Sequence, residues 1–185
     1  MVPALVVLSL AWTIASVCRH LLSTGPYIAG LVEQSNLPLM LIPAIMFIVA
    51  CGLSFATGTS WGTFGILIPI TITVCEFVAP WLSITSLSAV LAGAVFGDHC
   101  SPISDSTILS SIGAQCSHID HVATQVPYAV TVASVCIIGY IIAGLTSTLG
   151  YAVSVAITLP VSLALLVAAL LFIPGFLRNT AKVKV

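Results

Sequence analysis

Two carboxylates, Asp98 and Asp105, stand in the most polar stretch of an otherwise apolar sequence. Asp98 ends an apolar segment, and Pro102 lies between the two acids. Because proline lacks an N–H and disfavours a helical conformation in the residue before it, a helix must break near this position. We therefore expect two half-helices that meet at a gap. Ser104 or Asp105 would cap the second half-helix, which is expected over residues 108–114.

Such a gap could bind a small, hard cation. The carboxyl end of a helix presents free carbonyl groups and partial negative charge, so a carboxylate placed there favours a cation. A charged aspartate near the centre of a bilayer costs about 2.5–3.5 kcal/mol, which argues that both acids have a function. The alternative is that both lie in a loop outside the membrane, where Asp105 acts only as a helix cap.

The two acids would also couple a cation to a proton. Two neighbouring carboxylates in a medium of low dielectric constant cannot both ionise cheaply, so one should hold a proton until a cation enters. Na⁺ and H⁺ would then compete for one site, and this competition would link their fluxes. Competition of this kind is the physical basis of antiport.

Residues 57–65 form a second polar stretch, rich in glycine and hydroxyl side chains, between two apolar runs. Irregular backbone at bilayer depth is tolerated only where it is buried in protein or lines a cavity. An ordinary loop between two helices would have the same composition, so a helix break and a hairpin tip both remain open. With the hydroxyls of this stretch included, the predicted cation- and proton-binding residues are Asp98, Asp105, Ser101, Ser104, Thr107, Thr57, Thr59 and Ser60.

Three histidines near these stretches, His99, His118 and His121, are candidates for pH sensing because histidine titrates near physiological pH. His118 and His121 also suit a connector at the membrane surface with no further role. Their spacing from Cys100 and Cys116 does not match a standard zinc site. We therefore expect no resident metal and no cofactor, only transported Na⁺ and H⁺.

The composition decides which elements must position these residues. Lys and Arg total 4 and Asp and Glu total 5 in 185 residues, so charged residues make up 5%, against roughly 25% in soluble domains. Hydrophobic residues make up 59%. These values exclude a soluble domain and a nucleic-acid-binding protein. The predicted fold is all-α, a polytopic transmembrane helical bundle with broken or re-entrant helices, whose partner is the lipid bilayer.

The apolar residues form one predicted transmembrane domain, residues 1–177, followed by a basic tail, residues 178–185. The tail contains Arg178, Lys182 and Lys184, so the C-terminus is expected on the cytoplasmic side. No nucleophile elbow, phosphate loop or metal signature predicts an enzyme. The expected apolar segments are residues 3–18, 37–56, 66–79, 82–97, 122–145 and 149–173.

The polar stretches resemble those of the NhaC-type sodium/proton antiporter family. The resemblance is carried by FATGTSWGTF at 55–64 followed by ILIP at 66–69, and by GDHCSPISD at 97–105. It implies a helical transporter of the inner membrane, built from two related halves, that exchanges Na⁺ for H⁺. Family members are much longer than this chain, and the chain is similar to their C-terminal half.

The resemblance leaves alternatives open. The family range includes organic-acid and amino-acid carriers, so a Na⁺- or H⁺-coupled carrier of such solutes is a second expectation. The similarity to one half implies a missing N-terminal half or a partner chain. A fragment or subunit that does not transport is the third expectation.

Overall fold

The structure is a computed structural model that describes residues 38–182, with side chains to residue 171, and isolated positions between 9 and 30. Most of the predicted segment 3–18 and the side chains of the basic tail lie outside the described residues. The described part contains helices and no strands. Its elements are η1 (Leu39–Leu41), α3 (Ile42–Thr57), α4 (Ser60–Val78), η2 (Pro80–Leu82), α5 (Ser83–Cys100), α6 (Asp105–Gly113), α7 (His118–Thr146), η3 (Ser147–Leu149) and α8 (Tyr151–Lys182).

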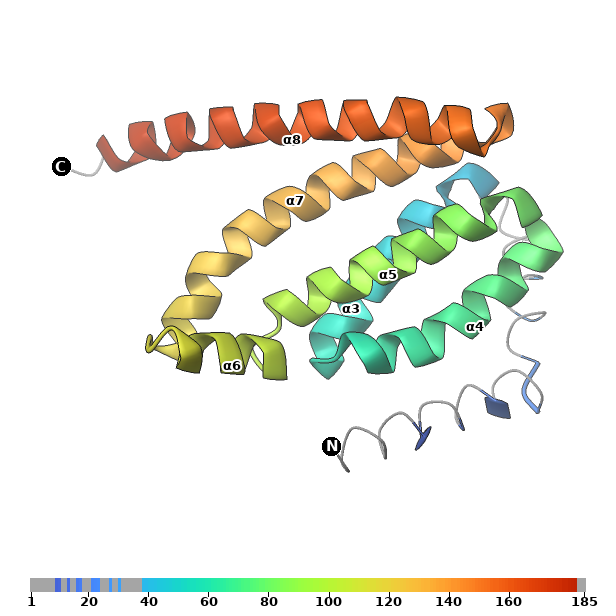
Figure 1. The fold of residues 1–185 in the computed structure, drawn as a ribbon, viewed down its shortest axis with the longest axis horizontal. Helices are drawn as coiled ribbons and strands as arrows, with labels where there is room; N and C mark the ends of the chain where they lie inside the picture. Colours follow the sequence, from blue (N-terminus) through green and yellow to red (C-terminus); the bar gives the residue numbers. More distant parts are fainter. Residues whose placement is uncertain are drawn as a thin grey trace.

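Five of these spans are long and apolar enough to cross a membrane. The prediction of an all-α, polytopic helical bundle is therefore confirmed. Helices α3, α4 and α5 lie side by side, and α7 leads from the end of the bundle near α6 to α8, which runs along its edge (Figure 1). The span Tyr151–Leu171 of α8 is only 6% buried inside the described structure. Its apolar surface is the kind that lipid or further protein covers.

Helices α3 and α5 make the closest contact in the bundle because two glycines of α5 face α3. A Cβ atom on Gly93 would overlap the carbonyl oxygen of Phe47, and one on Gly97 would overlap that of Cys51. Small residues four apart allow this approach of two helix backbones in membranes. Ser54 of α3 also donates a 2.6 Å hydrogen bond to the carbonyl oxygen of Ala94. The packing therefore fixes the end of α5, where Asp98 follows Gly97.

The polar stretch at 57–65 forms the tight tip of a hairpin between α3 and α4. Only Gly58 and Thr59 lie outside the two helices. Gly58 ends α3 with φ +67°, a left-handed conformation that glycine adopts without a steric penalty. Thr59 then caps α4, since its hydroxyl accepts a 3.4 Å hydrogen bond from the N–H of Gly62. Of the two possibilities that the sequence leaves open for residues 57–65, the structure has the hairpin tip and not the helix break. Helix α4 begins at Ser60, six residues before the predicted segment.

Candidate cation site

Asp98 lies in the last turn of α5 and is 8% exposed. Its two carboxylate oxygens accept hydrogen bonds from different parts of the chain. Ser104, just before α6, donates to Oδ1 at 2.6 Å. Ser60, the first residue of α4, donates to Oδ2 at 3.2 Å. The end of one helix and the beginnings of two others thus converge on a single carboxylate.

The turn between α5 and α6 is held by its own serine and threonine side chains. Ser101 has extended backbone angles, φ −74° and ψ 129°, as expected of a residue before proline. Its hydroxyl donates a 2.8 Å hydrogen bond to the carbonyl oxygen of Phe55 in α3. The hydroxyl of Thr107 donates to the carbonyl oxygen of His99 at 3.3 Å. These bonds satisfy carbonyl groups that helix ends leave free.

No charge in the described part of the chain balances Asp98. The side chains described for residues 38–171 include no Lys and no Arg, and Asp98 makes no ion pair with any of them. A buried carboxylate that has hydrogen-bond donors but no counter-charge is a favourable place for a cation. Oxygen ligands suit a hard cation, and Ser106 adds one more hydroxyl 2.8 Å from that of Ser104. The arrangement therefore offers a small cation one carboxylate and several hydroxyl oxygens as ligands.

Three other predicted site residues are placed outside this network. Thr57 donates to the carbonyl oxygen of Leu53 in its own helix at 2.9 Å. Thr59 serves as the cap of α4. Asp105 is exposed in the first turn of α6, and its side chain makes no hydrogen bond or ion pair within the described residues. Of the two predicted acids, only Asp98 lies among the serine hydroxyls.

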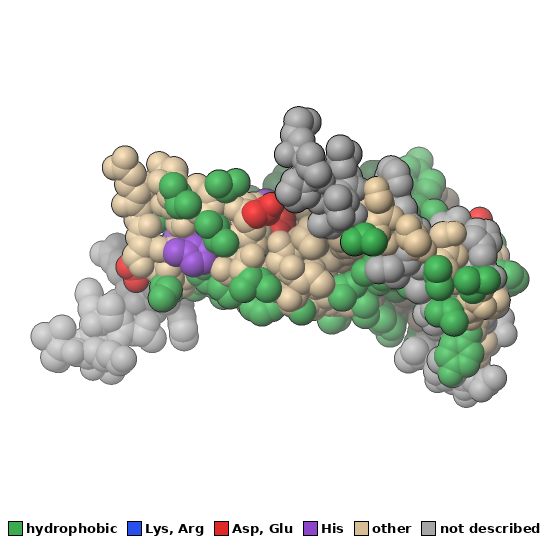
Figure 2. All heavy atoms as spheres, turned by 90° about the horizontal axis from the view of Figure 1, so that it is seen from below, with side chains coloured by type: hydrophobic (Ala, Val, Ile, Leu, Met, Phe, Trp, Pro, Cys, Tyr) green, Lys and Arg blue, Asp and Glu red, His purple; other side chains and the backbone are tan. Residues whose placement is uncertain are grey.

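Two of the histidines connect α7 to the candidate site. The Nε2 atom of His118 donates to the carbonyl oxygen of Pro102 at 2.7 Å, and its Nδ1 atom lies 3.3 Å from the hydroxyl of Ser111. The Nε2 atom of His121 lies 2.9 Å from the hydroxyl of Ser110. The first turn of α7 is thereby bonded to α6 and to the turn that precedes it. Figure 2 shows histidine and acidic side chains on one face, with hydrophobic side chains around them.

Sequence reasoning missed Ser111 and the contribution of Ser106. A helical spacing was the available signal, because Ser104, Thr107 and Ser111 follow one another at three and four residues and all are buried. This hydroxyl face of α6 turns toward α5 and α7. Ser106 carried no comparable signal, since its contact depends on the position of Ser104.

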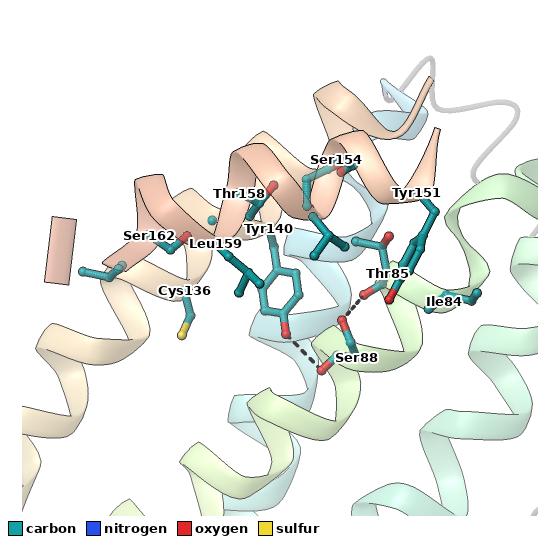
Figure 3. A pocket seen from close by; sticks show the side chains of 14 residues that line it. Ile84, Thr85, Ser88, Cys136, Tyr140, Tyr151, Ser154, Thr158, Leu159 and Ser162 are labelled. Atoms are coloured by element: carbon teal, nitrogen blue, oxygen red, sulfur yellow. Dashed lines mark hydrogen bonds between the residues drawn. The ribbon is translucent and has the colours of Figure 1, made fainter. Parts of the chain in front are cut away.

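Within the part of the chain that the structure describes, two hollows lie beside α7, and Asp98 lines neither of them. One, of about 780 Å³, lies between α5 and α7 and has His99, Gln125 and Tyr128 at one end. The other, of about 450 Å³, lies between α5, α7 and α8 and has seven hydroxyl side chains in its lining. In Figure 3 the hydroxyl of Tyr140 donates to the carbonyl oxygen of Ser88 across this second hollow, at 3.0 Å. The described residues that line these two hollows include no carboxylate.

Among the described residues, no group of three or more His, Cys, Asp or Glu side chains could hold a metal ion. The candidate site rests on one carboxylate and neutral hydroxyls. Such a donor set differs from the nitrogen and sulfur ligands that bind zinc.

Comparison with known proteins identifies the family. The model of the Na⁺/H⁺ antiporter family matches residues 1–145. An uncharacterized protein of Haemophilus influenzae is 52% identical over 143 residues, which are 77% of this chain and 27% of that protein. The malate-2H⁺/Na⁺-lactate antiporter of Bacillus subtilis is 30% identical over 140 residues, 67% of this chain and 30% of the relative. An uncharacterized Na⁺/H⁺ antiporter of Haemophilus influenzae is 32% identical over 114 residues, 56% of this chain and 24% of the relative.

No solved structure matches the chain. The chain spans less than a third of the length of these curated relatives. The matched residues include the hairpin tip, the end of α5 and all of α6. Together with its five apolar spans, the match makes this chain part of a multi-pass membrane protein. The chain belongs to the Na⁺/H⁺ antiporter family.

Proposed function

We propose that this chain forms the cation-binding part of a secondary transporter that exchanges Na⁺ for H⁺ across the cytoplasmic membrane. The C-terminus would face the cytoplasm, as the basic tail predicts. The observation that carries the proposal is the buried carboxylate of Asp98, which two hydroxyls hold and no described cation balances.

Na⁺ and H⁺ would compete for this carboxylate. With a proton bound, Asp98 is neutral and its burial costs little. With Na⁺ bound, the hydroxyls of Ser60 and Ser104 would turn their lone pairs toward the ion, because a hydroxyl can donate or accept. The hydroxyl of Ser104 could then donate to that of Ser106, 2.8 Å away. The same oxygens thus serve both states, and occupancy by one ion excludes the other.

The surrounding elements suit a site that changes access. Ser60 and Ser104 lie at the beginnings of α4 and α6, whereas Asp98 lies at the end of α5. Broken helices whose ends meet at an ion are a recurrent device of secondary transporters. A displacement of either α4 or α6 relative to α5 would remove one ligand and open the site.

The test uses the complete transporter, meaning this chain together with whatever polypeptide completes it in its native membrane. In everted vesicles with a respiration-driven pH gradient, added Na⁺ should dissipate the gradient through the wild-type protein. Asp98→Asn should abolish this exchange. Ser104→Ala should raise the half-saturating Na⁺ concentration about 10-fold or more, since the variant removes one oxygen ligand of the ion, and a polar contact with a charged group contributes about 1.5–3 kcal/mol.

Ser134→Ala is the matched control, because the hydroxyl of Ser134 bonds only to the carbonyl oxygen of Val130 in its own helix. It should leave exchange unchanged. Wild-type exchange in the Asp98→Asn protein would remove Asp98 from the mechanism.

A carrier of a small organic acid, coupled to Na⁺ or H⁺, is a second candidate function. One curated relative is named for malate and lactate exchange. The larger hollow lies next to the site, since His99 follows Asp98, and the buried Oε1 atom of Gln125 has no hydrogen-bond partner there within the described part. Uptake of labelled lactate that requires His99 would support this candidate. Na⁺/H⁺ exchange without any effect of lactate or malate would contradict it.

A further inference from the structure

Helix α6 has two faces of different character. Its inner face carries buried hydroxyls that contact α5 and α7. Its outer face carries four exposed residues, Asp105, Ile108, Leu109 and Ile112. The three aliphatic residues lie three, four and seven positions after Asp105, so all four share one side of the helix. Leu109 is 67% exposed and Ile112 is 66% exposed. A carboxylate therefore shares one exposed stripe with three large aliphatic side chains.

Neither lipid nor water suits this stripe. In hydrocarbon the charge of Asp105 would cost about 2.5–3.5 kcal/mol without a partner. In water the three aliphatic side chains would stay exposed, although burying apolar surface stabilises a protein by roughly 25 cal/mol for each Å². A protein surface that combines apolar side chains with one positive charge satisfies both parts of the stripe.

We propose that the outer face of α6 docks against another segment of the same transporter, one that presents a Lys or Arg to Asp105 and apolar side chains to Leu109 and Ile112. The side chains described for residues 38–171 contain no Lys or Arg, so the cation comes from elsewhere. The curated relatives supply ample sequence for such a segment, because this chain spans only 24–30% of their length. Asp105 would then be an assembly residue and not an ion ligand.

The docked face would also affect the candidate cation site. Ser104, which donates to Asp98 at 2.6 Å, directly precedes Asp105. A partner that holds Asp105 therefore holds the backbone that positions this hydroxyl. Docking goes beyond the proposed function, since it concerns how the transporter assembles and would operate for any transported ion.

Photo-crosslinking tests the docking directly. A photoreactive amino acid replaces Leu109 in the complete transporter, and in a second variant it replaces Leu163 of α8, which is similarly exposed at 62%. After illumination in the membrane, peptide mass spectrometry should find position 109 joined to a protein segment that contains Lys or Arg. Position 163, the matched control, should yield at least fivefold less of any protein crosslink. Lipid adducts alone at position 109 would overturn the proposal.

Charge substitution at Asp105 separates this proposal from the ion site. Asp105→Lys should reduce the crosslink at position 109 at least fivefold by placing two cations together, and Asp105→Asn should reduce it less. The Na⁺ affinity of Asp105→Asn, measured by binding of radioactive Na⁺, should fall less than tenfold because docking is weakened but the ion ligands remain, whereas Asp98→Asn should lose binding. Loss of Na⁺ binding in both Asn variants would make Asp105 an ion ligand and overturn the docking role. Unchanged binding in Asp98→Asn would contradict only the proposed function.

Discussion

Replacing His118 should weaken Na⁺ binding without any direct contact to the ion. Its Nε2 atom donates to the carbonyl oxygen of Pro102, which lies between Ser101 and Ser104 in the turn before α6. His118→Leu removes this 2.7 Å bond and the weaker 3.3 Å contact with Ser111. A hydrogen bond of this kind contributes about 0.5–1.5 kcal/mol. Loss of both contacts should cost about 1–2 kcal/mol. If this whole cost falls on the turn that positions Ser104, the Na⁺ affinity should be roughly 5–30-fold weaker.

A second substitution separates positioning from pH sensing. A carbonyl oxygen only accepts hydrogen bonds, so Nε2 carries a proton in both the neutral and the charged imidazole. The bond to Pro102 therefore persists in either state. His118→Gln supplies an amide N–H but no titratable group. We expect His118→Gln to restore most of the Na⁺ affinity lost in His118→Leu and to keep the wild-type pH profile.

The assay is the Na⁺ dependence of gradient dissipation in everted vesicles, repeated across pH 6–9. Thr124→Ala serves as the control on α7, because the hydroxyl of Thr124 bonds only to carbonyl oxygens of its own helix. Wild-type Na⁺ affinity in His118→Leu would refute the positioning role. A pH profile displaced in His118→Gln would instead support the prediction that His118 senses pH.

Two further predictions concern the packing that holds the site. Gly97→Val should prevent stable folding, because even a Cβ atom there would overlap the carbonyl oxygen of Cys51. The thermal unfolding midpoint in detergent should therefore fall sharply. A midpoint equal to wild type would contradict the close contact of α3 and α5. Gly58→Ala should cost about 1–2 kcal/mol, because φ is +67° and the new methyl group would press on Ile103. Gly52→Ala is the control for both, since nothing lies within 4 Å of its Cβ position, and its midpoint should match wild type.

Hydropathy alone predicted most of the fold. The predicted segments at 82–97 and 122–145 lie inside the spans Pro80–Cys100 and His118–Leu149, and the segment at 37–56 begins two residues before the span Leu39–Thr57. The expected break near Pro102 is present, because the ring and the missing N–H act locally. The predicted segment at 66–79 begins six residues after the observed start of α4. Glycine and threonine after Thr59 predict irregular backbone, but the cap at Thr59 begins a helix at Ser60 that includes them.

The candidate site was predicted less completely than the fold, for a geometric reason. Each residue of a helix is rotated by about 100° from the one before it. The conformation of Ser101 to Ser104 therefore decides which way α6 presents Asp105, and no local pattern encodes that rotation. Asp98 differs, because Gly97 directly before it must face α3. The hydroxyls of Ser60 and Ser104 were predicted from composition, whereas the partners of His118 depend on how α7 returns to the bundle.

The glycine contact of α5 with α3 would limit the motions open to the proposed transporter when it changes access to its site. With Gly93 and Gly97 against the backbone of α3, neither helix can slide along the other without a collision. The two helices would therefore move as one rigid pair that carries Asp98. If the proposed exchange operates, rocking would occur at the tip around Gly58 and at the turn around Pro102, so a bound ion would stay with the pair while α4 and α6 moved relative to it.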